Sequence, residues 1–418
     1  MGTDTTEDTT AGTPTGRRSP LHSRHEALGA TFTDFAGWDM PLQYSSSLEE
    51  HRAVRERAGL FDLSHMGEIW VRGGGSVEVL NRTFVSGFAK LGVGRAKYTL
   101  LCNERGGIVD DLIVYRLDDE EFMAVPNAAN VAPVLAALRA SAAAVGGVLV
   151  EDATAATALI AVQGPRAEAV LIAAVESHGG RDAEVEAVRD LRYYAAMRLV
   201  VAGVPAVVAR TGYTGEDGFE LFVPAGLAGG LWDLLLDVGA HAGLTPAGLG
   251  ARDSLRLEAG MPLCGHELTP ETAPSQVGAG RVVSLSKPQD FPGREALERL
   301  SERIEKDGHA APVLVGLSAD TRRAMRAGCE VLSEATPAPM TTDDEGGLGA
   351  DQELGRVGVI TSGLFSPTLG HAIAMALVDP GVARVGTEVV VDVRGRPQAA
   401  TITGVSTTGS LRFLPAHH

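Results

Sequence analysis

Two adjacent acidic residues inside an apolar stretch are the side chains of this sequence best suited to chemistry. Asp110 and Asp111 lie in Gly106–Tyr115, which is otherwise rich in aliphatic residues. Because side chains alternate between the two faces of a strand, the two carboxylates point in opposite directions, and we expect at least one to be buried. Burial raises the pKa of a carboxyl group and lets it exchange protons nearer neutral pH. The alternative is a strand end where both carboxylates are solvated or cap a turn.

A tight turn at 117–120 is expected to pair this strand with the next one. In the register that such a turn implies, residue 117 faces residue 120 and Asp111 faces Pro126. Asp111 then lies beside Asn127, at the point where a helix begins. A carboxylate next to a carboxamide is a plausible wall of a small-molecule pocket, although an asparagine before a helix is more often only its cap.

The glycine-rich segment Gly212–Glu220 is not a phosphate-binding loop. It lacks the G-K-[ST] ending of such loops and lies between two strands rather than before a helix. The plain interpretation is a turn in which three glycines supply positive φ angles. Glu220 follows in a strand and faces either a pocket or solvent.

A predicted helix carries two arginines on one face, because Arg252 and Arg256 are four residues apart. Together they suit an anchor for an anion or a ring carbonyl. On periodicity alone the favoured alternative is a solvated face that includes Asp253 and Glu258.

The neighbours Asp62-Leu63-Ser64-His65 contain the residue types of a catalytic triad, but such a triad is not formed by consecutive residues, and we exclude it.

The elements that position these residues alternate without a regular βαβ rhythm. A capping box at Ser47–Glu50 predicts a helix to about Ala58 with Gly59 as its exit. Thr245 as N-cap and Pro246 in the first turn predict a helix that ends at Gly260. An Ala-rich helix is expected over 130–145. Strands are expected at 66–72, 108–116, 121–126, 197–202, 205–211 and 218–223.

After residue 310 the pattern changes to short strands separated by glycine turns. This pattern predicts an all-β end domain, either a barrel or a jelly roll. The fold class expected for the whole chain is therefore α+β with a C-terminal β-domain. Residues 1–18 and 333–353 are rich in Thr, Gly, Asp and similar residues, and we expect both segments to be disordered or flexible.

Composition excludes several classes of protein. The 418 residues carry a formal charge of −17, which argues against a nucleic-acid binder. The three cysteines, Cys102, Cys264 and Cys329, have no zinc-like spacing, so we expect no metal and reduced thiols in a cytoplasmic protein. No signal peptide is visible, and the longest apolar stretch, 131–150, is Ala- and Gly-rich and contains Arg139, so we expect no membrane span.

Several long blocks of the sequence resemble aminomethyltransferase, the T-protein of the glycine cleavage system, in family order across about residues 20–393. The blocks are FAGWDMPLQY (35–44), GLFDLSHMGEIWVRG (59–73), KYTLLCNERGGIVDDLIVY (97–115), GYTGEDGFELFVP (212–224), PAGLGARDSLRLEAGMPL (246–263), DFPGREAL (290–297) and GVITSGLFSPTLGHAIAMALVDP (358–380).

The resemblance implies a three-domain ring around a folate-binding channel. Two α+β domains would be interleaved over residues 19–310, about 19–66 with 153–259 and about 67–152 with 260–310. The C-terminal β-barrel would occupy 311–418, with 333–353 as a flexible insertion.

The resemblance also implies a reaction, in which the aminomethyl group on the lipoyl arm of H-protein passes to tetrahydrofolate. The products are 5,10-methylenetetrahydrofolate, ammonia and the dihydrolipoyl arm. Asp111 matches the essential carboxylate of the family and would position the folate and assist proton movement. The implied folate-site residues are Met66, Tyr98, Asn127, Tyr213, Glu220 and Arg252.

Three departures from the family pattern stand out. The family usually has Tyr at Cys264 and Trp at Arg281, and its C-terminal end is usually aromatic and basic. We therefore assign no role to the tail here. The insertion at 333–353 is also atypical.

Lipoylated H-protein is the implied partner, and a monomer or weak oligomer is expected. Residues 1–16 and 333–353 carry −3 and −6, which leaves about −8 on the remaining chain. A body of this charge can still present a local basic face to an acidic partner or an anionic folate.

Two other functions remain open on the same fold. One is a folate-linked demethylase that acts on a methylated amine or sulfonium compound. The other is a non-catalytic folate-binding protein of iron–sulfur cluster maturation, although no cysteine motif of that class is visible.

Overall fold

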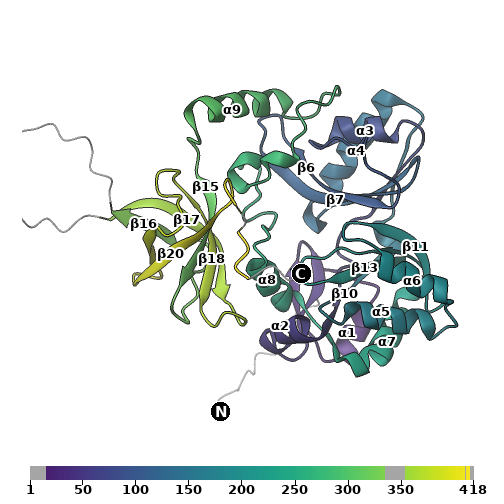
Figure 1. Ribbon diagram of the computed structural model, residues 1–418. Coiled ribbons are helices and arrows are strands. Elements are labelled where there is room, and N and C mark those ends of the chain that lie inside the picture. Colours follow the sequence, from purple (N-terminus) through teal and green to yellow (C-terminus); the bar gives the residue numbers. More distant parts are fainter. Residues whose placement is uncertain (1–15, 335–353, 410, 415–418) are drawn as a thin grey trace, which may run out of the picture.

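The protein is described here from a computed structural model that covers residues 16–334, 354–409 and 411–414. Figure 1 shows three parts: a β-barrel at the left, a sheet with its helices at the upper right, and a second sheet with its helices at the lower right. Mixed helices and strands with a C-terminal barrel confirm the α+β fold class. The predicted domain boundaries stay a prediction.

The lower-right part is built on a six-stranded sheet in the order β11-β12-β13-β10-β4-β14. Its core joins aliphatic residues of the sheet to those of three helices, with Trp232 fully buried among them. One strand of this sheet precedes the upper-right sheet in the chain and five follow it. The elements are β4 (Ala58–Asp62), β10 (Thr157–Gln163), β11 (Ala196–Val201), β12 (Val204–Ala209), β13 (Gly218–Pro224), β14 (Leu244–Pro246), α5 (Ala167–Glu176), α6 (Asp182–Asp190) and α7 (Ala228–Gly239).

The upper-right part is a five-stranded sheet in the order β6-β7-β8-β5-β9. Its two helices lie against each other and pack on the sheet, where Phe84, Phe122 and Leu138 are fully buried. The elements are β5 (Ile69–Arg72), β6 (Arg95–Cys102), β7 (Ile108–Asp118), β8 (Glu121–Val125), β9 (Leu149–Asp152), α3 (Ser76–Thr83) and α4 (Val131–Val145). The predicted hairpin is therefore present.

The closed barrel has the order β15-β18-β17-β16-β19-β20. The barrel confirms the expected all-β end domain. Strand β16 includes residues 333 and 334, so the expectation of flexibility over 333–353 is wrong at its start. The strands are β15 (Val313–Ala319), β16 (Glu330–Glu334), β17 (Leu354–Phe365), β18 (Ala372–Val378), β19 (Glu388–Asp392) and β20 (Pro397–Val405). Helix α9 (Arg294–Asp307) precedes the barrel, and Leu297 is its only buried residue.

The expectation of disorder over residues 1–18 is wrong at its end. Arg17–Arg18 form β1, which pairs in parallel with β3 (Trp38–Gln43), and β2 (Thr31–Phe35) completes a small sheet. Helix α1 (His22–Ala27) lies between β1 and β2. Residues 1–15 and 335–353 lie outside the described residues, as do residues 415–418.

Two predicted helix starts are displaced. Helix α2 (Ser47–Glu56) takes Ser46 rather than Ser47 as its N-cap, and Gly59 lies in β4 rather than at a helix exit. Helix α8 (Leu249–Glu258) begins after Gly248, because Thr245 and Pro246 belong to β14 and pair with β4. Pairing with a neighbouring strand outweighs the local capping signal at this second site.

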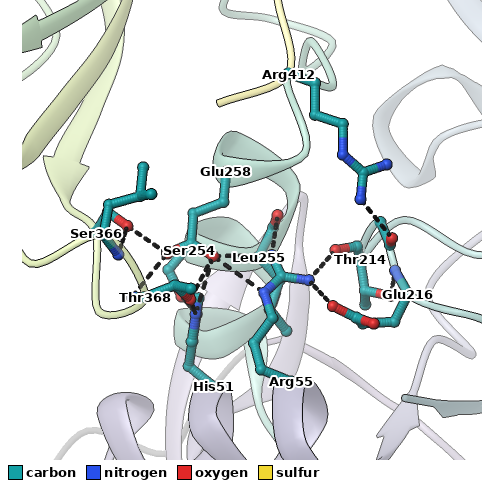
Figure 2. Close-up of polar contacts among 12 residues, drawn as sticks. His51, Arg55, Thr214, Glu216, Ser254, Leu255, Glu258, Ser366, Thr368 and Arg412 are labelled. Atoms are coloured by element: carbon teal, nitrogen blue, oxygen red, sulfur yellow. Dashed lines mark hydrogen bonds and ion pairs between the residues drawn. The ribbon is translucent and has the colours of Figure 1, made fainter. Parts of the chain in front are cut away.

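The barrel joins the rest of the molecule through a buried polar junction around Glu258, on α8 (Figure 2). Its Oε1 accepts from the Ser366 hydroxyl at 2.5 Å, and its Oε2 accepts from the Arg55 guanidinium at 2.9 Å. Oε2 also lies 3.1 Å from Nε2 of His51. Burial alone would raise the pKa of Glu258, but these partners outweigh it and lower that pKa to about 2. The junction thus holds a carboxylate that stays ionised.

Among the described residues, one helix, Ala128–Val145, is long and apolar enough by length and composition alone to cross a membrane. It comprises a short 3-10 turn (Ala128–Asn130) and α4. Val134, Leu138 and Ala142 on one face are buried against the five-stranded sheet. The expectation that the chain has no membrane span stays a prediction.

Candidate active site

A cavity of about 390 Å³ lies where the two α+β parts meet, and it contains every residue that sequence analysis proposed for the site. Its walls come from segments that are far apart in the chain, including β6, β7, β13 and α8. The seven proposed residues that line it are Met66, Tyr98, Asp111, Asn127, Tyr213, Glu220 and Arg252. Their roles stay a proposal, but their convergence on one cavity is a property of the fold.

Strand β7 places one carboxylate in the cavity and the other behind its wall. Asp111 is part-exposed and lines the cavity, whereas Asp110 is fully buried on the opposite face of the strand. Neither lies at a strand end, so the solvated alternative is wrong. The expected pairing is also wrong by one residue: Ile113 faces Val125, because the turn lies one residue later than expected, with Asp118 opposite Glu121, and a register shift before Asp118 corrects only part of that difference.

Two neighbours hold the Asp111 carboxylate in place. The Tyr98 hydroxyl donates to Oδ2 at 3.1 Å, and the Asn127 amide donates to Oδ1 at 2.9 Å. Burial raises the pKa of Asp111 to about 6, against the lowering effect of these hydrogen bonds. A carboxyl group in this range can both accept and return a proton near neutral pH.

Asn127 binds the acidic pair and does not cap the helix that follows it. Its side chain makes no capping hydrogen bond, so the capping interpretation is wrong. The Nδ2 atom instead lies 2.9 Å from Oδ1 of Asp110, 2.9 Å from Oδ1 of Asp111 and 2.8 Å from the Asp111 carbonyl oxygen. One carboxamide thus ties together both acids of β7.

Glu220 provides a second carboxylate in the cavity, from β13. Its Oε2 accepts from the Thr211 hydroxyl at 2.5 Å and from the Tyr115 hydroxyl at 3.3 Å. Among the residues that the structure describes, Oε1 has no hydrogen-bond partner. Of the two alternatives, Glu220 therefore faces a pocket rather than bulk solvent.

Arg252 lies over the ring of Tyr213, with its guanidinium carbon 4.8 Å from the ring centroid. The Tyr213 hydroxyl donates to the Pro262 carbonyl at 2.5 Å, which fixes the ring. The solvated-face alternative for α8 is wrong, because Arg256 is buried against Glu267 and Arg252 faces the cavity.

The glycine-rich loop before Glu220 is shaped by close approach more than by unusual φ angles. Of its three glycines only Gly215 has a positive φ, of 79°. At Gly212 and Gly218 an added Cβ would lie 2.0 Å and 2.4 Å from the Gln163 side-chain amide. Glycine is needed there for space.

Sequence analysis missed His65, which lines the cavity next to Met66 and is almost fully buried. Burial, together with the charge of Arg252, lowers the pKa of His65 to about 3, so its ring is neutral at neutral pH. The exclusion of a catalytic triad at residues 62–65 was reasonable, but with it His65 was left out of the candidate site. Only its position beside Met66, within a family-like block, pointed to the site.

Asp110, Asp111 and Cys264 bring three possible metal-ligating atoms within 4.8 Å of one another. Spacing along the chain could not reveal this group, because the cysteine is more than 150 residues from the acids. The asparagines at 127 and 130 donate to the carboxylates, which suits hydrogen bonding better than a cation. The expectation of no metal stays a prediction.

A partly buried carboxyl group with a raised pKa, in a cavity lined by aromatic rings, is typical of the active site of an enzyme. Comparison with known proteins identifies the family. Residues 21–287 match the model of the GCVT N-terminal domain, and residues 313–406 match the glycine cleavage T-protein C-terminal barrel domain.

Relatives named aminomethyltransferase agree with this chain over nearly its whole length. The aminomethyltransferase of Cutibacterium acnes is 49% identical over 92% of this chain and 96% of its own length. The aminomethyltransferase of Streptomyces coelicolor is 51% identical over 91% of this chain and 94% of its own length. The crystal structure of the glycine cleavage system aminomethyltransferase T from Bartonella henselae superposes with a TM-score of 0.79 at 36% identity, over 95% of this chain and 98% of that one. The chain belongs to the glycine cleavage T-protein family of aminomethyltransferases.

Proposed function

We propose that the chain transfers the aminomethyl-derived one-carbon unit from the lipoyl arm of H-protein to tetrahydrofolate, in the cytoplasm and as a monomer or weak oligomer. Two N–H bonds of the folate are replaced by an N–CH₂–N bridge. The hydrogens leave in ammonia and in the thiol of the released dihydrolipoyl arm, so the step balances without an oxidant. The observation that carries the proposal is Asp111, a cavity carboxyl group whose pKa is near 6.

The residues of the cavity suit a folate. A carboxylate such as Glu220 can accept the adjacent N–H donors of a pterin edge. Met66 and Tyr213 offer the apolar and ring surface that a pterin or benzoyl group needs. We propose that Tyr98 and Asn127 hold the Asp111 carboxylate against the reacting nitrogen.

In this proposal Asp111 acts twice. As a carboxylate it takes a proton from the attacking folate nitrogen, and as the resulting acid it supplies a proton to the departing ammonia. Both forms must be accessible at the working pH, which an ordinary surface aspartate with a pKa near 4 does not provide.

The test is a coupled assay with aminomethylated H-protein, run with and without tetrahydrofolate. We expect rapid ammonia release that depends on tetrahydrofolate. Demethylation of methylated amines or sulfonium compounds is measured in parallel, and we expect none. Demethylation without ammonia release would support the demethylase alternative, and absence of any folate-dependent turnover would support the non-catalytic one.

A further inference from the structure

Asp110 is a buried acid that touches the reacting residue without reaching the cavity. It is fully buried, on the face of β7 opposite Asp111, and is not among the described residues that line the cavity. A neutral side chain of the same shape would fill its position without placing two acids within 4.8 Å of each other. An acid at this position therefore calls for an explanation beyond packing.

Three hydrogen bonds hold the Asp110 carboxylate. Its Oδ2 accepts from the Asn127 backbone N–H at 3.2 Å. Its Oδ1 accepts from the side-chain amides of Asn127 at 2.9 Å and Asn130 at 2.7 Å. Because the Asn127 amide also contacts Asp111, the position of Asp110 determines how that amide meets the Asp111 carboxylate.

Among the described residues, the titratable groups that face Asp110 are Asp111, on its own strand, and Cys264, from the loop after α8. The β6 residue opposite is the apolar Leu101. Burial, then the charges of the two acids, raises the pKa of Cys264 to about 12, so the thiol stays neutral. Around Asp111, burial raises the pKa of Tyr98 and Tyr213 well above their usual range. Over the working pH range the acids are thus the only members of this group that change charge.

Asp110 and Asp111 titrate as a coupled pair. Burial, then the charge of Asp111, raises the pKa of Asp110 to about 7, against the hydrogen bonds from Asn127 and Asn130. Coupling between two sites is reciprocal, so an ionised Asp110 raises the proton affinity of Asp111 by the same amount.

We propose that Asp110 is a positioning residue for the transfer reaction: it orients Asn127 against Asp111 and, when ionised, makes Asp111 the stronger base. This inference rests on the proposed function of Asp111. It predicts that activity gains a second, higher-pH step, which belongs to the Asp110–Asp111 pair and is lost when Asp110 is replaced.

The test compares Asp110→Asn with the wild type in the coupled assay between pH 5.5 and 9. The ratio of wild-type to variant kcat is expected to rise through pH 7, by up to about tenfold for each unit by which ionised Asp110 raises the pKa of Asp111. The KM for tetrahydrofolate is expected to stay unchanged, because Asp110 is outside the cavity. A ratio that is constant with pH would overturn the proposal, since loss of structure alone slows the enzyme equally at every pH.

A second variant keeps the proposal testable if Asp110→Asn does not fold. Asn130→Ala removes one hydrogen bond that stabilises the Asp110 carboxylate, so the upper step should move to higher pH. An unmoved step would overturn the proposal.

Glu68→Gln is the matched control. Glu68 is similarly buried, and burial raises its pKa well above the usual range, but its carboxyl has no hydrogen-bond partner among the described residues. Its variant should keep the wild-type profile, and a profile altered like that of Asp110→Asn would count against the proposal. A wild type without turnover would instead contradict the proposed function.

Discussion

At the scale of single residues, the cavity separates two carboxylates by what surrounds them. Asp111 receives hydrogen bonds from Tyr98 and Asn127 and keeps a pKa near 6. Within the part of the chain that the structure describes, Glu220 is held through Oε2 only, by Thr211 and Tyr115. The first environment suits proton exchange, and the second suits recognition of a ligand that presents two N–H donors.

Glu220→Gln tests this division of roles. The substitution replaces a charged hydrogen-bond acceptor with a neutral amide. Because a hydrogen bond to a charged group contributes about 1.5–3 kcal/mol, tetrahydrofolate should bind roughly 10- to 150-fold more weakly to the variant. We expect kcat to change much less than the dissociation constant. Binding is measured by calorimetric titration, with Glu120→Gln at the exposed hairpin turn as control. An unchanged affinity would show that Glu220 does not contact the folate.

At the scale of elements, the sequence predicted correctly the strands and turns that depend on interactions between residues close together in the chain. The β7–β8 hairpin follows from alternating apolar residues and a tight turn, and its strands lie close to the expected positions. The register was wrong by one residue because the turn pairs Asp118 with Glu121, one residue later than expected, and the irregularity before Asp118 that offsets part of this leaves no signal in the pattern. Pro246 was misassigned because β14 pairs with β4, a strand far away in the chain.

The candidate site divides in the same way. Alternation along one strand was enough to single out Asp111 and to expect a raised pKa. Residue patterns alone did not place Arg252 or Glu220 in the same site as Asp111, because the cavity joins segments more than 100 residues apart. Their assignment to the site came from the family resemblance. The hydrogen bond from Asn130 to Asp110 and the position of Cys264 beside them depend on tertiary packing and were not foreseen.

At the scale of the whole molecule, the Glu258 junction connects the barrel to the body. The Glu258 carboxylate binds Ser366 of the barrel and Arg55 of α2 (Figure 2). Its backbone carbonyl accepts from the backbone N–H of Phe413, near the C-terminus. Arg55 also donates to the carbonyl of Thr214, next to the cavity residue Tyr213. The barrel and one cavity wall are thus attached to the same buried charge.

Because the pKa of Glu258 is lowered from 4.5 to about 2, its contribution to stability is complete above the unfolded value and is lost as the pH falls through the folded one. Glu258→Gln should therefore lower the free energy of unfolding at pH 7 by about 3 kcal/mol. At pH 3 the difference from the wild type should fall to roughly half of that value. Urea unfolding at both pH values measures it.

Glu305→Gln, on the exposed face of α9, is the control for that measurement and should match the wild type at both pH values. A Glu258→Gln difference that is equally large at pH 3 would mean that the carboxylate is not held ionised by its partners.

The most direct test of the account is Asp111→Asn in the coupled assay with aminomethylated H-protein and tetrahydrofolate. Loss of the proton-exchanging group should reduce turnover by about 10²- to 10⁴-fold, while the dissociation constant of tetrahydrofolate stays within a few-fold of the wild type. Asp237→Asn, at an exposed position of α7, serves as the matched control. A fully active Asp111→Asn enzyme would contradict the central claim that this carboxyl group carries the proton transfers.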